Sequence, residues 1–128
     1  KAFPDKIGAS IEKYRFREAL GELMNLARLG NKYLADTEPW KLKKTDEART
    51  ETIMNISMQI AASLAVLSEP FMPFSSEKLK AILALNNVTW NDAGGIIISD
   101  NHKINPATHL FNKIEDDKIE EQLEKLKQ

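Results

Sequence analysis

Apolar residues recur every three or four positions along most of this 128-residue sequence. Between residues 16 and 34 they fall on one face of a helix, and charged side chains occupy the opposite face. The apolar face consists of Phe16, Leu20, Leu23, Ala27, Gly30 and Leu34. This period predicts an all-α fold, and the length is that of about one domain.

Prolines set the expected limits of the first two helices. A short helix over residues 5–13 follows Pro4, which suits a first helical turn. Pro39 ends the second helix, because the residue before a proline avoids the α conformation. We expect close helix packing at the three glycines in these helices, Gly8, Gly21 and Gly30.

A third helix is predicted from Thr45, as its capping residue, to about Leu67, before Pro70. Residues 53–68 carry no charge and are apolar around most of the helix, so we expect this helix at the centre of a bundle. That stretch is shorter than the roughly 20 residues that cross a bilayer. The next helix is predicted to be capped by one of two serines, Ser75 or Ser76.

The helical period is absent from residues 86–106. Residues 96–98 are three isoleucines, which favour a short strand or an extended packed segment. Asp116 and Asp117 then begin a last helix that is predicted to reach Gln128. The sequence therefore predicts an all-α helical bundle with an irregular segment before its last helix.

Charge and composition exclude several functions. No cysteine is present, which excludes disulfides, thiolate zinc sites and cysteine nucleophiles. The net charge of −1 argues against a protein that binds nucleic acid with its whole surface. The charge is uneven, however, at +3 over residues 1–50 and −4 over residues 51–128. We therefore expect a polyanion to approach the first half.

Catalysis by this chain is not expected. The only histidines, His102 and His109, together with Asp100 could ligate a metal, but their spacing is more typical of ordinary loop residues. Asp116 and Asp117 point in different directions on a helix, so the pair indicates helix capping rather than acid–base chemistry.

The segment after Pro39 carries the most specific chemistry. Trp40 directly follows the proline, and Lys41, Lys43 and Lys44 come next. An aromatic ring beside cations suits single-stranded nucleic acid, since the ring stacks on a base and ammonium groups lie near phosphates. The alternative is that Trp40 is a buried anchor at the corner between two helices and the lysines are a solvated loop.

Five motifs occur in register along nearly the whole chain. They are Asn31-x-Tyr33 with Pro39-Trp40, the FREAL run at 16–20, SEPFMP at 68–73, WND at 90–92 and LFNKIED at 110–116. In their order along the chain, these motifs resemble those of the C-terminal anticodon-binding domain of the methionyl-tRNA synthetase family. The resemblance implies a helical bundle of the class I synthetase type over residues 1–100. Residues 101–128 would be an extension and helix that pack back on the bundle within the same domain.

The resemblance also implies a function in protein biosynthesis. In that family the ligase joins methionine to its tRNA with ATP and Mg on a separate catalytic domain, so this chain would be a non-catalytic, RNA-binding fragment without a cofactor or metal of its own. Its partners would be the CAU anticodon loop of tRNA(Met) and the catalytic domain of the same parent chain. The expected location is the cytoplasm, without a membrane.

Site residues follow from the resemblance position by position. Trp40 matches the family tryptophan on which the first anticodon base, a cytosine, stacks, and Pro39 matches the proline that helps to hold it. Candidate RNA-backbone contacts are Arg28, Lys32, Lys41, Lys43 and Lys44. Asn31 and Tyr33 either orient the loop or pack in the core.

One departure concerns base recognition. The family also reads the cytosine with an Asn and an Arg four residues apart on an upstream helix, and no Asn-x-x-x-Arg occurs here. Asn25 and Arg28 have the wrong spacing, so we expect the fragment to begin after that helix. Two other functions remain open: a helical protein–protein interaction module in which Trp40 and Pro39 pack inside, and the equivalent domain of another class I aminoacyl-tRNA synthetase.

Overall fold

A computed structural model describes residues 2–127, and within them it contains helices and no strand. The α-helices are α1 (Phe3–Glu12), α2 (Phe16–Thr37), α3 (Pro39–Leu42), α4 (Glu47–Leu67), α5 (Pro73–Ile82) and α6 (Asp116–Leu126). One 3-10 turn, η1 (Trp90–Asp92), lies in the long segment between α5 and α6. The predicted all-α class and the irregular segment before the last helix are confirmed.

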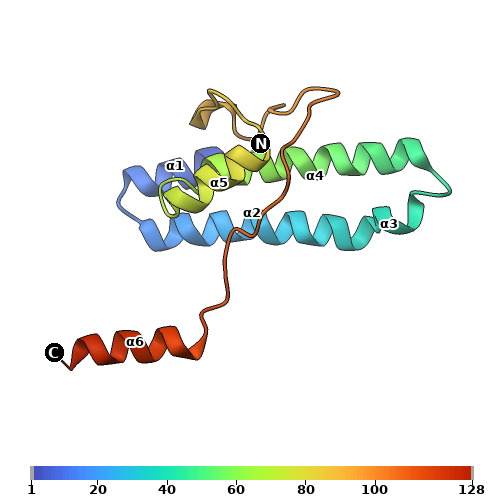
Figure 1. Cartoon of the computed structure of the whole chain (residues 1–128). Coiled ribbons are helices and arrows are strands. Elements are labelled where there is room, and N and C mark those ends of the chain that lie inside the picture. The colour runs from blue at the N-terminus through green and yellow to red at the C-terminus, as the bar shows by residue number, and fades with distance from the viewer. Residues whose placement is uncertain (1, 128) are drawn as a thin grey trace.

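The long helices α2 and α4 lie side by side and run in opposite directions, with α3 in the connection between them (Figure 1). α1 packs against α2, and α5 packs against α4. α4 therefore contacts α2, α3 and α5, which confirms its predicted central position. This arrangement leaves the α2–α4 connection at one end of the bundle and the α1–α2 turn at the other.

Two groups of buried side chains form the core, and α4 contributes to both. The first consists of Ile7, Ala19, Leu23, Leu26, Val66, Leu67 and Ala93. The second consists of Ala62, Ala65, Leu83 and Ile98. Trp90 is half-buried beside the first group, and its ring would lie 3.6 Å from a Cβ atom placed on Gly8. The close packing expected at Gly8 is thus a contact with the irregular segment.

The start of α4 differs by one residue from the prediction. The N-cap is Asp46, whose carboxylate accepts a hydrogen bond from the backbone N–H of Arg49 at 3.0 Å. Thr45 instead donates its hydroxyl to the carbonyl of Leu42 at 3.3 Å, so the prediction of Thr45 as cap is wrong. Asp46 is the better cap because its acceptor oxygen reaches a free first-turn N–H and its charge complements the helix dipole.

The predicted serine cap of α5 is also wrong. The helix begins at Pro73, and its N-cap residue, Met72, makes no side-chain capping bond. Ser76 is buried within α5, where its hydroxyl donates to the carbonyl of Ala65 on α4 at 2.6 Å. Ser75 is half-buried in the first turn of the helix. A proline at the first position needs no N–H partner, which lets the helix begin earlier than the serines suggest.

The irregular segment is ordered by hydrogen bonds rather than by strand pairing. Ile98 is buried in the second core group while Ile96 is exposed, so the isoleucine run is an extended packed segment. In η1, the Asp92 carboxylate accepts from both the backbone N–H and the hydroxyl of Thr89. These two hydrogen bonds hold the pKa of Asp92 below its ordinary value.

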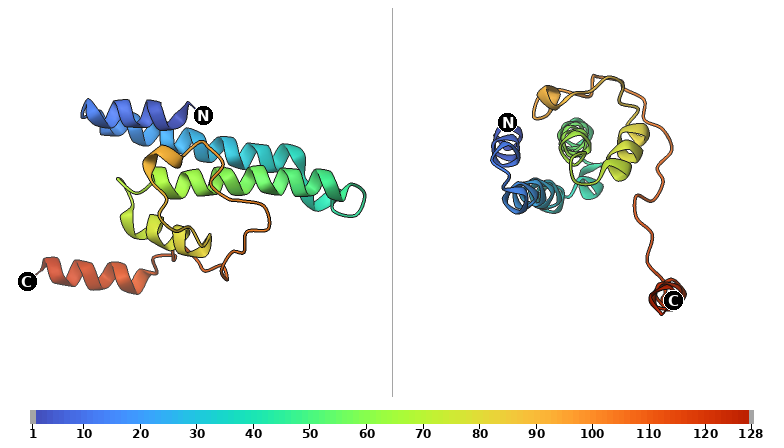
Figure 2. Two further views of the ribbon diagram at one scale, coloured as in Figure 1. Left: turned by 90° about the horizontal axis from the view of Figure 1, so that it is seen from above. Right: turned by 90° about the vertical axis from the view of Figure 1, so that its left-hand side faces the viewer.

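The last helix was expected to pack on the bundle, but in the structure α6 lies apart from it. The chain crosses the bundle after Asn101, where Asn105 bonds to the backbone of α5 and Phe111 lines a pocket together with Leu79. It then departs, and α6 lies apart from the other helices with none of its residues buried (Figure 2). α6 has an apolar stripe, but its charged residues dominate and the packed part of the extension ends before it. The division at residue 100 stays a prediction.

Candidate nucleic-acid interface

A sharp turn after α2 sets the direction of Trp40. α2 ends at Thr37, and Glu38 takes the left-handed conformation with φ of 42°. The Glu38 N–H still bonds to the carbonyl of Leu34 at 3.0 Å, which completes the last turn of the helix. Pro39 then begins α3, because its fixed φ suits a first helical position. The turn separates α2 from α3 and places α3 at the end of the bundle, before the loop that leads back into α4 (Figure 1).

Pro39 and Trp40 have opposite environments. Pro39 is buried, whereas the Trp40 side chain is 62% exposed. An open cavity of about 470 Å³ lies beside the Trp40 ring, against the first turns of α4. It is lined by Pro39, Trp40, Lys43, Glu47, Thr50, Glu51 and Met54. The interpretation of Trp40 as a buried corner anchor is wrong, because Pro39 fills that place.

The lysines near Trp40 differ in their pairing. Lys41 forms an ion pair with Glu38 at 2.7 Å, between Nζ and Oε1. Lys43 and Lys44 are exposed and have no ion-pair partner within the part of the chain that the structure describes. Surface pairs are worth little in water, so all three cations can contact a phosphate, and Lys43 and Lys44 can do so without losing a partner.

The remaining predicted residues lie further up α2. Lys32 is paired with Asp36 at 2.6 Å, and Arg28 donates to the Asn25 side chain at 3.1 Å. Arg28 is nine residues before the end of α2, about 14 Å along its axis. The structure thus groups Pro39, Trp40, Lys41, Lys43 and Lys44, and it leaves Arg28 outside that group.

Asn31 is exposed on α2 and Tyr33 is half-buried. The Tyr33 carbonyl accepts from the hydroxyl of Thr37 at 2.6 Å, which stabilises the last turn of α2. Its phenol hydroxyl makes no hydrogen bond among residues 2–127. Tyr33 therefore supports the loop through its backbone and its packing.

Sequence reasoning missed the α4 side of the site. Glu47, Glu51 and Met54 follow a helical spacing, so one face of α4 is acidic at its start and apolar beyond it. The local sequence pattern could reveal that face but not that it lies against α3, because the contact depends on how the chain folds between α2 and α4.

The histidines do not form a site. The His102 ring nitrogen Nε2 bonds to the carbonyl of Leu83 at 2.7 Å, and His109 is exposed. Within residues 2–127 no three His, Asp or Glu side chains lie close enough together to hold a metal ion. Over the same residues no helix is long and apolar enough to span a membrane.

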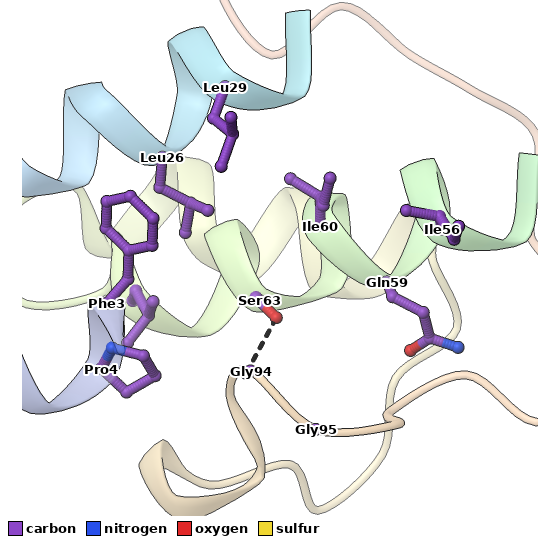
Figure 3. A pocket seen from close by; sticks show the side chains of 11 residues that line it. Phe3, Pro4, Leu26, Leu29, Ile56, Gln59, Ile60, Ser63, Gly94 and Gly95 are labelled. Carbon is purple, nitrogen blue, oxygen red and sulfur yellow. Dashed lines mark hydrogen bonds between the residues drawn. The ribbon is translucent and has the colours of Figure 1, made fainter. Parts of the chain in front are cut away.

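A separate, apolar pocket lies between α1, α2 and α4 and has a volume of about 240 Å³. Figure 3 shows Phe3, Leu26 and Ile60 around it, with the Gly94 N–H donating to the Ser63 hydroxyl. None of the predicted site residues lines this pocket. Its lining offers packing surface rather than charge, so the candidate interface remains the end of the bundle that carries Trp40.

Comparison with known proteins identifies the family. The sequence profile described as the anticodon binding domain of methionyl tRNA ligase matches residues 5–128. A methionine–tRNA ligase from Christiangramia forsetii is 57% identical over 98% of this chain, which covers 19% of that protein. Those from Cytophaga hutchinsonii and Flavobacterium psychrophilum are 58% and 54% identical over 98% of the chain, or 18% and 19% of their own lengths.

This chain therefore spans about a fifth of the length of the curated relatives that it matches. The match covers all the helices described above except the first two residues of α1. The methionyl relatives also argue against the alternative of a domain from a synthetase for another amino acid. By its sequence and its helical fold, the chain belongs to the family of anticodon-binding domains of methionyl-tRNA ligases.

Proposed function

We propose that this chain is the anticodon-binding part of a methionine–tRNA ligase and that it positions the CAU anticodon loop of tRNA(Met) by stacking the first base on Trp40. One observation carries the proposal: a tryptophan that is 62% exposed follows a buried proline and precedes exposed lysines. The open cavity beside the ring and the exposed lysines that follow it favour a ligand that covers the ring.

The arrangement suits an unpaired nucleotide. Stacking of a base on an aromatic ring contributes about 1–3 kcal/mol and tolerates any base. Lys43 and Lys44 lie just beyond Trp40 and supply charge for the phosphates of the same strand. The buried Pro39 anchors the start of α3, so the position of the ring is set before RNA arrives.

The chemistry of the parent enzyme would lie elsewhere. Methionine activation with ATP and Mg belongs, in this proposal, to a catalytic domain in the remaining four-fifths of the parent chain, and that domain is the second partner. The expected location of the enzyme is the cytoplasm. The alternative of a protein-interaction module is not favoured, because it needs Trp40 inside the fold and the ring is exposed.

Replacing Trp40 in the parent ligase tests the proposal. Trp40→Ala should lower kcat/KM for tRNA charging by about fivefold to 150-fold, which corresponds to about 1–3 kcal/mol of lost stacking. Methionine activation measured without tRNA should be unchanged. Phe74→Ala is a matched control, because Phe74 is an aromatic residue that is 80% exposed on another helix. Equal loss in both reactions, or loss in neither, would contradict the proposal.

A further inference from the structure

A second cavity lies next to the one beside Trp40. It lies between α4 and the loop of residues 98–104 and has a volume of about 600 Å³. Its lining consists of Glu51, Met54, Asn55, Met58, Ile98, Ser99, Asp100, Asn101, His102 and Ile104. Glu51 and Met54 also line the Trp40 cavity, so the two cavities are neighbours along α4.

The loop wall of this cavity is held firmly on the helices. The Gln59 side chain on α4 accepts from the backbone N–H groups of Ile97 and Ile98 and donates to the Ile98 carbonyl at 2.6 Å. At the other end, His102 bonds to the Leu83 carbonyl and the Asn105 side chain donates to the Ala81 carbonyl at 2.7 Å. A wall fixed at both ends gives a cavity that exists before any ligand binds.

The lining combines flat apolar surface with hydrogen-bond acceptors. Met54 on α4 and Ile104 on the loop are 45% and 50% exposed, so apolar atoms line the second cavity from both sides. Asp100 adds a carboxylate. His102 must carry a proton on Nε2 to donate to a carbonyl, which leaves Nδ1 of the neutral ring as an acceptor.

The two cavities differ in their cations. Lys43 lines the Trp40 cavity together with Glu47 and Glu51, whereas the second cavity is lined by Glu51 and Asp100 and by no lysine or arginine. Neither Glu51 nor Asp100 forms an ion pair among the described residues. Carboxylates repel a phosphate but accept hydrogen bonds from the amino group of cytosine. The second cavity, which has acids and no cation in its lining, therefore suits the edge of a base rather than the backbone of a strand.

We propose that this cavity is a second base subsite, which takes an unpaired base with an exocyclic amino group from the strand stacked on Trp40. The subsite rests on the proposed function, because Trp40 must first anchor the strand. Thr50 in the Trp40 cavity and Asn55 in the second cavity are five residues apart on α4, about 7.5 Å. That distance is about two stacked nucleotides, so a nearby nucleotide of the same strand reaches the subsite.

The test compares binding of labelled hexacytidylate and hexauridylate to the full chain by fluorescence anisotropy. The two RNAs have similar rings, but cytosine presents an amino donor where uracil presents a carbonyl. We expect the chain to bind hexacytidylate about tenfold more tightly. Asp100→Asn should reduce this preference to less than twofold, because an amide can also donate to uracil. Ser99→Trp should do the same by filling the cavity from an exposed position.

Asp5→Asn is the matched control for charge, since Asp5 is an exposed acid in the first turn of α1 and lines neither cavity. It should leave the preference unchanged, and circular dichroism of each variant should show unchanged helix content. A preference that survives both Asp100→Asn and Ser99→Trp, or that is absent from the unmodified chain, would overturn the subsite. Trp40→Ala separates the two proposals: if it weakens neither RNA, the proposed function fails and the subsite fails with it.

Discussion

Pro39 and Trp40 are adjacent in the chain, yet only the proline is buried. The difference arises at Glu38, whose left-handed conformation ends α2 and begins α3 with position 39 buried and position 40 exposed. The sequence singled out this pair of residues, but it did not decide whether Trp40 is an exposed stacking ring or a buried anchor. No local sequence pattern predicts the positive φ of Glu38, so the exposure of the Trp40 ring could not be predicted.

Thr45 and Asp46 offer a direct test of the helix cap. Asp46→Ala should lower the free energy of unfolding by about 1 kcal/mol, because the N–H of Arg49 loses its acceptor. Thr45→Ala should change it by less than about 0.5 kcal/mol, since the hydroxyl is exposed and bonds only weakly to Leu42. Thermal unfolding followed by circular dichroism measures both. A larger effect at Thr45 than at Asp46 would contradict the assignment.

At the scale of the elements, helical spacing predicted α1, α2, α4 and α6 closely, because an amphipathic face is a local property. It failed at the cap of α5, where Ser76 faces another helix rather than its own first turn. The four-residue α3 was also missed, since so short a helix has no period and depends on its packing against α4.

The glycines of α2 differ in what surrounds them. A Cβ atom on Gly30 would lie 3.0 Å from Cγ2 of Ile60, so close packing of α2 on α4 is confirmed there. A Cβ atom on Gly21 would meet nothing within 4 Å, so close packing is not the reason for that glycine.

Gly21→Ala should therefore stabilise the fold by about 1 kcal/mol, the difference in helix propensity. Gly30→Ala should gain less, because Ile60 must move to accept the new methyl group. Chemical denaturation of the two variants measures the difference. If Gly30→Ala were the more stable variant, the proposed contact between the two helices would be wrong.

For the whole molecule, a net charge of −1 hides a lysine-bearing end beside Trp40. The excess of basic residues in the first half correctly indicated where cations gather, but not which of them are paired. Lys32 and Lys41 each form an ion pair with an acid within one helical turn, while Lys43 does not. Which lysines are paired depends on the fold and on side-chain conformation, and the sequence specifies neither directly. The position of α6 was equally inaccessible, since an amphipathic stripe does not specify what it packs against.

Salt dependence tests the role of these cations. The affinity of the chain for an anticodon stem-loop RNA should fall between 50 and 200 mM salt, because phosphate contacts release counterions. Lys43→Ala should reduce the slope of log affinity against log salt by about 1. Lys32→Ala should change the slope less, since Lys32 is already paired with Asp36. Equal slopes for the unmodified chain and Lys43→Ala would exclude Lys43 as a phosphate contact.

The fluorescence of Trp40 reports most directly on whether the ring is a stacking surface. In a Trp90→Phe variant Trp40 is the only tryptophan, and its exposed ring should be quenched strongly by iodide. Addition of an anticodon stem-loop RNA should quench the emission and protect the ring from iodide, with the same midpoint as binding measured by anisotropy. RNA that binds while the emission and the iodide accessibility of Trp40 stay unchanged would contradict the account.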